Sequence, residues 1–396
     1  MNTDHDVREL LERMAREPAI GPVDPEPILR RARRRLARTA ILGFACAALV
    51  VGVAVGGANL VLSSPSVPAI PNPTTDEEPN GDLHPILRVG EVMIQDVGSG
   101  RLEALDPSTG DRRTILDCED QCGRIFGYAI SADGRWLAYY LTCGGSCPPE
   151  TGIWVTNALG DEHQLTQGGS GQPWAWSPRG STLAASVSSG LLTIDPRTGD
   201  RTTIATPALV EALAWSLDGT EIVYAANGLE SVDLDSGEIT ELADARNVDS
   251  IAWSPDGSRI VVDDFRGERN RIIVLNRDGS DQRVLVDQGA PQGPSAPAWS
   301  PDGTSIAYVT TPGKVVGNQG LFSFEVWVIG ADGSDATRLF HGDCCIGDWR
   351  GPVWSPDGTR IAFFDDVDTE YGTWLVVDAD GTGSPEPIDE IEVQTW

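Results

Sequence analysis

The sequence predicts an all-β protein, a β-propeller made of four-stranded blades. The first observation is a repeated phrase, Trp-Ser-Pro-Asp-Gly, which is clearest at 253–257, 299–303 and 354–358. The second is its spacing, because six intact or altered copies have glycines at 134, 180, 219, 257, 303 and 358. One fixed turn in each unit of about forty residues is typical of propeller blades.

Each unit has the same predicted order of strands and turns. An apolar strand ends at the tryptophan, the Ser-Pro-Asp-Gly turn follows, and a second apolar strand begins, as at 260–262 and 306–309. In the turn, proline presets φ, aspartate suits the third position and glycine accepts a positive φ. Because the tryptophan recurs through the units, we interpret it as packing between blades.

The number of blades follows from counting hairpins as well as turns. There are six turn motifs but seven outer hairpins, and the unmatched hairpin, 91–116, has no clear innermost strand. Residues 391–396 have the pattern of an innermost strand that ends at its tryptophan. We therefore predict seven blades, with the C-terminal strand completing the first blade and closing the ring. Six blades with an additional flap are the alternative.

The longer phrase Trp-Ser-Pro-Asp-Gly-x-x-Ile-Ala, followed by Phe or Tyr, resembles the repeat of the TolB-like β-propeller family. The resemblance covers residues 86–396 and implies the propeller fold. In that family the repeat serves transport accessories, sensor ectodomains and the non-catalytic half of peptidases. The resemblance therefore implies a fold and no single function.

A transmembrane helix is predicted at 40–62, which contains twenty-three residues without a charge. About twenty apolar residues are enough to span a bilayer as a helix. Six arginines lie between 30 and 38, and acidic residues follow at 76–78. The positive-inside rule then predicts a cytoplasmic N-terminus and an extracytoplasmic body in the cell membrane. A cleaved signal peptide ending near 56–58 is less favoured, because the polar leader and the apolar run are both long. Lipid attachment at Cys46 is less favoured still, because Cys46 lies inside the apolar run.

Two further segments flank this helix. Residues 1–39 predict a partly helical cytoplasmic tail, which serves either to orient the chain in the membrane or to dock a cytoplasmic partner. Residues 63–85 contain six prolines and predict a semi-extended stalk. The predicted organisation is tail, membrane helix, stalk and a propeller at 86–396.

The charge of the chain limits its partners. The formal net charge is −30, and residues 40–396 carry twenty basic against fifty-two acidic side chains. Such a surface repels nucleic acid, so we predict no nucleic-acid partner.

Apart from Cys46, the cysteines are even in number, and an extracytoplasmic location favours disulfides. A four-cysteine zinc site is the alternative, but its ligand spacing is usually shorter. All six are predicted on one face of the propeller. The sequence leaves their connectivity open: 118/122 and 143/147 pair internally or with each other, and 344/345 form a vicinal bond. The disulfide candidates are Cys118, Cys122, Cys143, Cys147, Cys344 and Cys345.

Catalytic motifs are scarce in this sequence. After the stalk only His163 and His341 remain, and no Gly-x-Ser-x-Gly elbow is present, so we predict no enzyme and no cofactor. A metal-dependent or thiol enzyme is the competing class. His341 lies near Asp343 and Cys344 in the sequence, so it is a candidate metal ligand. The simpler alternative is a loop histidine whose hydrogen bonds are made within the protein.

The acidic hairpin turns lack the spacing of a twelve-residue calcium loop. Two acidic pairs, predicted in loops on the cysteine-bearing face, are better candidates for Ca²⁺ or ligand binding. Two tryptophans at or near the ends of innermost strands are candidate anchors for a peptide or glycan, with ordinary packing as the alternative. These binding candidates are Trp174, Trp349, Asp263, Asp264, Asp365 and Asp366.

The predicted function is non-catalytic binding of a protein or envelope ligand by the loops of one face of an extracytoplasmic propeller. The alternative is a transmembrane signal transducer, in which the propeller is the sensor and the cytoplasmic tail binds a regulator.

Overall fold

The chain separates into two compact units, Met1–Val55 and Gly56–Trp396, and the computed structural model describes residues of the second. The predicted tail and membrane helix, and the stalk up to residue 84, lie outside the described residues. Among the described residues, no helix has the length and apolarity needed to cross a membrane. The described ranges are 85–88, 91–96, 101–106, 109, 111–117, 123–143, 151–166, 173–187, 190–205, 210–267, 269–289, 293–310, 322–344, 351–365 and 373–388.

Within these ranges, twenty-seven strands form seven antiparallel sheets that follow one another in chain order. The first sheet has three described strands and each of the others has four, paired in chain order. Sheets 1 to 3 contain β1 (Val92–Asp96), β2 (Arg101–Leu105) and β3 (Arg112–Asp117); β4 (Gly123–Ile130), β5 (Trp136–Cys143), β6 (Gly152–Asn157) and β7 (Glu162–Gln164); β8 (Trp174–Trp176), β9 (Leu183–Val187), β10 (Gly190–Ile194) and β11 (Arg201–Ala205). Sheets 4 and 5 contain β12 (Ala212–Trp215), β13 (Glu221–Ala225), β14 (Leu229–Asp233) and β15 (Ile239–Ala243); β16 (Ile251–Trp253), β17 (Arg259–Phe265), β18 (Arg269–Asn276) and β19 (Arg283–Gly289). Sheets 6 and 7 contain β20 (Pro294–Trp299), β21 (Ser305–Thr310), β22 (Phe322–Gly330) and β23 (Thr337–Cys344); β24 (Val353–Trp354), β25 (Arg360–Asp365), β26 (Thr373–Asp378) and β27 (Glu386–Ile388).

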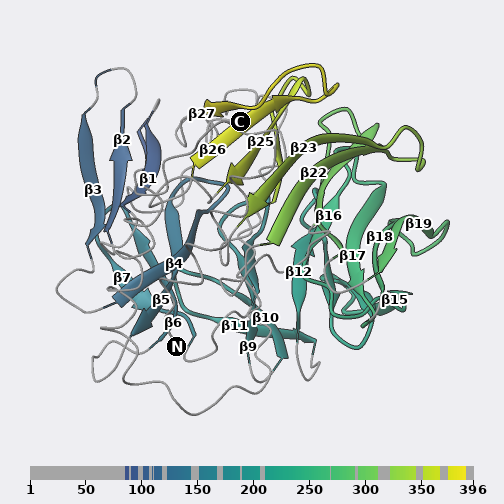
Figure 1. Ribbon diagram of the computed structural model, residues 1–396. Coiled ribbons are helices and arrows are strands. Elements are labelled where there is room, and N and C mark those ends of the chain that lie inside the picture. The colour runs from purple at the N-terminus through teal and green to yellow at the C-terminus, as the bar shows by residue number, and fades with distance from the viewer. Residues whose placement is uncertain are drawn as a thin grey trace, which may run out of the picture. The chain divides into compact units, whose positions relative to one another are not determined.

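This arrangement is consistent with a seven-bladed propeller, and the all-β prediction is confirmed. The sheets succeed one another from the blue β1–β3 sheet through teal and green to the yellow β24–β27 sheet (Figure 1). The first sheet lacks a fourth described strand, as the hairpin count predicts. Residues 391–396, predicted to supply that strand, lie outside the described residues, so closure of the ring stays a prediction.

The Ser-Pro-Asp-Gly turn is closed by side chains of its own sequence. Ser254 Oγ donates to Asp256 Oδ1 at 2.6 Å and accepts from the Arg259 amide at 2.9 Å. The Gly257 amide donates to the Ser254 carbonyl at 2.8 Å, and this glycine has a φ of 69°. Copies of these contacts occur at 300–305 and 355–360. The serine therefore ties the start of the turn to both its centre and its exit.

The repeated tryptophan joins neighbouring sheets, as predicted. Its indole nitrogen donates to an alanine carbonyl in the innermost strand of the preceding sheet, at 2.9 to 3.2 Å. These pairs are Trp176 with Ala129, Trp215 with Ala175, Trp299 with Ala252 and Trp354 with Ala298. Trp253 differs, because its buried indole nitrogen has no acceptor among the described residues. A guanidinium lies over the ring of Trp253 and over that of Trp299, with Arg277 at 5.5 Å and Arg259 at 4.6 Å from the ring centroids.

The core lies between consecutive sheets. One buried cluster joins Val223 and Leu229 of sheet 4 to Ile260 and Ile273 of sheet 5, and equivalent clusters join other neighbours. Every sheet thus has two ends. The turn end carries the Ser-Pro-Asp-Gly motif, and the loop end carries the connections between sheets and the loop between the second and third strands.

A candidate binding site at the loop end of sheet 5

The acidic pair Asp263 and Asp264 lies at the loop end of sheet 5, but in a strand and not in the loop that the sequence predicted. Strand β17 continues through both residues because its pairing with β18 extends as far as Phe265 opposite Asn270. Both aspartates are fully buried, with 0% exposure. Neighbouring residues of a strand point to opposite faces of the sheet, so the two carboxyls have separate environments.

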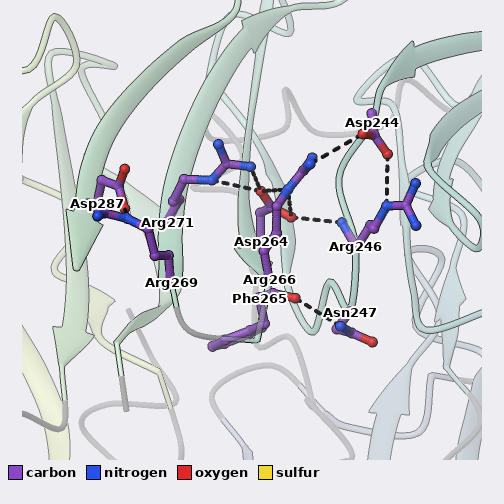
Figure 2. Close-up of polar contacts among 9 residues, drawn as sticks. All are labelled: Asp244, Arg246, Asn247, Asp264, Phe265, Arg266, Arg269, Arg271 and Asp287. Atoms are coloured by element: carbon purple, nitrogen blue, oxygen red, sulfur yellow. Dashed lines mark hydrogen bonds and ion pairs between the residues drawn. The ribbon is translucent and has the colours of Figure 1, made fainter. Parts of the chain in front are cut away.

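Asp264 is bonded to two arginines (Figure 2). Its Oδ2 accepts from Arg266 Nε at 2.9 Å and from Arg271 Nε at 3.0 Å, and a second bond from Arg271 comes through Nη2. Its Oδ1 accepts from the Arg246 amide at 2.8 Å. Because two guanidiniums neutralise it, Asp264 is a buried carboxylate with its charge compensated.

Asp263 accepts hydrogen bonds from backbone amides and has no cationic partner among the described residues. Its Oδ1 accepts from the amides of Asp249 and Ser250, at 2.9 and 2.8 Å, and its Oδ2 accepts from the Ala296 amide at 3.3 Å. The Ala296 contact reaches the innermost strand of sheet 6, where alanine has a φ of 50°. Asp263 therefore fixes the loop before β16 and an unusual backbone position in the next sheet.

Burial and the nearby Asp249 carboxyl raise the pKa of Asp263 to about 7, although its amide donors oppose the rise. Burial also raises the pKa of Asp249 and of Glu211. Glu211 Oε2 accepts from the Val248 amide at 3.0 Å, so this acid holds the same loop from the side of sheet 4. The three acids form an environment that favours protonated carboxyls.

Residues 244–250 and 263–271, without Glu268, are called the loop cluster below. Its backbone is held together by reciprocal hydrogen bonds (Figure 2). The Phe265 amide donates to the Arg246 carbonyl at 2.9 Å, and Asn247 Nδ2 donates to the Phe265 carbonyl at 2.8 Å. Asn247 has a φ of 47°, a conformation that asparagine tolerates better than most residues. These bonds pre-organise the loop cluster.

The exposed surface of the loop cluster contains both arginines and acids, and the Asp244 side chain is 56% exposed. The Arg246 and Arg269 side chains are each 62% exposed, whereas those of Arg266 and Arg271 are 33% and 22% exposed. Arg246 and Arg266 both contact Asp244, and Arg269 contacts Asp287 at 2.7 Å. The site is therefore a set of cations arranged over a buried carboxylate.

Sequence reasoning identified the aspartates and missed the arginines that bind Asp264. A usable signal was present, because five of the twenty basic residues after position 39 lie between 246 and 271, and four of these five belong to the loop cluster.

The other predicted binding residues have different outcomes. Trp174 begins β8 and is half-buried against the core between sheets 2 and 3, which agrees with the packing alternative. Asp365 ends β25 at the loop end. Trp349 and Asp366 lie outside the described residues, so their predicted roles stay predictions.

The cysteines are described only in part. Cys143 ends β5 and Cys344 ends β23, both at loop ends, as expected for a common face. Cys118, Cys122, Cys147 and Cys345 lie outside the described residues, so disulfide pairing stays a prediction.

Two other polar sites stand apart from the loop cluster. His341 Nδ1 lies 3.1 Å from Glu325 Oε1, which also accepts from Arg338 at 2.8 Å, so this histidine is a partnered one. At the turn end, Arg277 binds Glu221 and Asp218 beside an open depression of about 490 Å³. Among the residues that the structure describes, no group of three or more His, Cys, Asp or Glu side chains is placed to hold a metal ion.

Several solved structures are similar to this chain. The chain is similar to the solved structure of an oligogalacturonate lyase in complex with manganese, with a TM-score of 0.50 and 16% identity over 77% of this chain and 85% of that one. The fold is a β-propeller. Similar structures also include TolB from Acinetobacter baumannii, with a TM-score of 0.44 and 15% identity over 76% of this chain and 63% of that chain. A putative TolB from Agrobacterium tumefaciens has a TM-score of 0.43 and 20% identity over 70% of this chain and 97% of that one.

TolB proteins, whose family the repeated phrase resembles, are thus among the similar solved structures. At these identities the likeness extends no further than the fold. This chain spans less than two thirds of the Acinetobacter protein. No protein-family model and no curated protein matches the sequence.

Proposed function

We propose that this protein is a single-pass membrane protein whose propeller, outside the cytoplasm, binds a protein or envelope ligand without catalysis. The membrane part of the proposal rests on the uncharged run at 40–62 and the arginines before it. The binding part rests on the loop cluster.

The observation that carries the binding role is the rigid construction of the loop cluster beneath an exposed polar surface. Asp263 and Asp264 are completely buried and together accept hydrogen bonds from six residues. Loops fixed before binding lose less conformational entropy when a partner docks. At the other end of sheet 5 the repeated turn is closed by its own residues, and Arg277 there is paired with Asp218 and Glu221 of sheet 4.

Catalysis and binding are both compatible with the fold alone, because an oligogalacturonate lyase shares it. The proposal for binding therefore rests on the site. The described contacts of the loop cluster are those of a structural and recognition surface, with arginines exposed and carboxyls used as supports.

Site-directed photo-crosslinking of the full chain in intact cells tests this proposal. A photo-reactive phenylalanine analogue is placed at Gln288, at the loop end of β19, or at Gln282, just before β19 at the turn end. We expect a discrete crosslinked protein from position 288 and none from 282. Equal crosslinking from both ends, or none from either, would contradict the proposal.

Protease added to intact cells tests the topology. We expect the propeller to be digested from outside while the N-terminal tail stays protected. Protection of the propeller in intact cells, with digestion only after lysis, would contradict an extracytoplasmic location.

A further inference from the structure

The loop cluster carries a row of alternating charges (Figure 2). Asp244 lies between Arg246 and Arg266, and Asp264 lies between Arg266 and Arg271. Arg269 and Asp287 form a separate pair at the other side. Each of these acids is thus engaged by at least one guanidinium, and the arginines outnumber them by one among the described residues.

The guanidiniums keep donors that the protein does not use. Arg246 and Arg269 contact their aspartates through Nε, at 3.0 and 2.7 Å. Their terminal nitrogens have no acceptor among the described residues, and neither do Arg266 Nη2 and Arg271 Nη1. Counted over the described residues, six terminal guanidinium nitrogens at this end of sheet 5 have no acceptor.

Two of these guanidiniums are already fixed in place. Arg266 and Arg271 are both tied to Asp264, which is 0% exposed and is itself held by the Arg246 amide. A fork of guanidinium donors matches the two oxygens of a carboxylate, and charge-assisted bonds of this kind are among the stronger ones in proteins. Fixing the donors beforehand lowers the entropic cost of using them.

The charges of the rest of the chain indicate which class of anion these arginines bind. Charges further away than about 8 Å are largely screened at physiological salt, so a short ligand responds mainly to the local arginines. A long polyanion also experiences the other side chains, and residues 40–396 carry twenty basic against fifty-two acidic groups. The local and overall charges together favour a short acidic segment over an extended polyanion.

We propose that Arg246, Arg266, Arg269 and Arg271 form a docking surface for a protein segment that presents two or more Asp or Glu carboxylates. This inference rests on the proposed binding function and specifies the chemistry of the partner. Arg246 and Arg269 are the outer contacts, and Arg266 and Arg271 are the central pair positioned by Asp264.

The test uses the full chain in nanodiscs of zwitterionic lipid and a fluorescent peptide of alternating Glu and Gly, with a Gln–Gly peptide as the matched probe. The double variant Arg246→Gln/Arg269→Gln removes the two outer guanidiniums. Arg283→Gln is the matched control, because Arg283 is 53% exposed and pairs with Asp281 at the turn end of the same sheet. Both outer arginines have exposed aspartate partners, so folding is expected to survive, and thermal unfolding checks it.

We expect the Glu peptide to bind the wild-type chain, and the Gln peptide to bind more weakly. The double variant should lose about tenfold in affinity or more, since it removes the two outermost charge-assisted contacts with the peptide. Arg283→Gln should bind as the wild type does. Arg246→Lys/Arg269→Lys should be intermediate, because it retains charge and loses the planar fork.

Three results would overturn the proposal: equal affinity of the wild type and the double variant, equal binding of the Glu and Gln peptides, or tighter binding of an RNA oligonucleotide than of the Glu peptide. If the double variant still crosslinks its cellular partner from position 288, the binding function stands and only this surface is wrong. If the double variant is misfolded, the lysine variant provides the comparison.

Discussion

The two ends of sheet 5 are built by different means. At the turn end, Ser254, Asp256 and Arg259 close the turn with bonds between residues two and five positions apart. At the loop end, Asp263 and Asp264 bond to residues as far as thirty-three positions away and in another sheet. The bonds of the turn motif itself recur in sheets 6 and 7, whereas Arg277 at the same end reaches Asp218 and Glu221 of sheet 4 through bonds outside the motif.

The comparison shows where the fold and the function of this protein are encoded. Local bonds within a motif can be copied into every unit, so they specify the scaffold. The loop cluster depends on carboxyls whose partners come from three separate segments, so it is not specified by a repeated local motif and can carry a specific role. Within it, Asp264 is neutralised by arginines, whereas Asp263 is surrounded by amides and other acids.

The largest effect is expected from Asp264→Asn. This change leaves Arg266 and Arg271 without their buried counter-charge, and removing one partner of such a pair costs up to about 3–5 kcal/mol. Since both arginines are partly exposed, we expect a loss of about 3 kcal/mol in the free energy of unfolding, measured by urea denaturation. Asp287→Asn breaks the exposed pair with Arg269 and should cost less than about 1 kcal/mol. Similar losses for both variants would contradict the role given to Asp264.

In contrast to Asp264→Asn, the substitution Asp263→Asn should raise the free energy of unfolding at high pH. The folded-state pKa of Asp263, about 7, lies above its ordinary 3.8, so the folded protein holds more protons in that window. Wild-type stability should therefore fall as pH rises from about 4 to about 7. The shift corresponds to about 4 kcal/mol at most, and loss of the Ala296 bond offsets about 1 kcal/mol.

We thus expect Asp263→Asn to stabilise the protein by about 2 kcal/mol at pH 8 and to give no gain at pH 4. Unfolding free energies across this range provide the measurement. A difference between variant and wild type that does not change with pH would show that Asp263 titrates normally.

A smaller effect is expected at the turn end. Ser254→Ala removes one donor and one acceptor and should cost about 1 kcal/mol. Ser300→Ala should cost the same within a few tenths of a kcal/mol, because Ser300 makes the same two bonds at 2.6 and 2.9 Å. Clearly different losses at the two turns would mean that the repeated motif is not energetically equivalent in neighbouring sheets.

The smallest effect distinguishes two tryptophans. Trp299→Phe loses the bond to the Ala252 carbonyl, whereas Trp253 has an indole nitrogen without an acceptor among the described residues. Trp299→Phe should therefore be more destabilising than Trp253→Phe, by about 1 kcal/mol in thermal or urea unfolding. The reverse order would contradict a stabilising role for the hydrogen bond from Trp299 to Ala252, since both rings also have a guanidinium nearby.

This contrast also explains what the sequence could predict. The turn was predictable because Ser254, Asp256 and Gly257 make their contacts within a few residues, and because the pattern recurs. Asp263 and Asp264 were recognised as candidates, but their burial depends on how far β17 and β18 pair. The link from Asp264 to Arg246 crosses eighteen positions and a chain reversal, which no local pattern specifies.

The most direct test of the functional account is crosslinking from Gln288 in cells that express the wild type, Arg246→Gln/Arg269→Gln or Arg283→Gln. All three chains keep the same reporter position at the loop end, and only the double variant changes the exposed arginines beside it. We predict that the wild type and Arg283→Gln crosslink the same partner, and that the double variant loses it. Undiminished crosslinking by a folded double variant would contradict the docking role of Arg246 and Arg269, and absence of a crosslinked partner from all three chains would contradict the binding function.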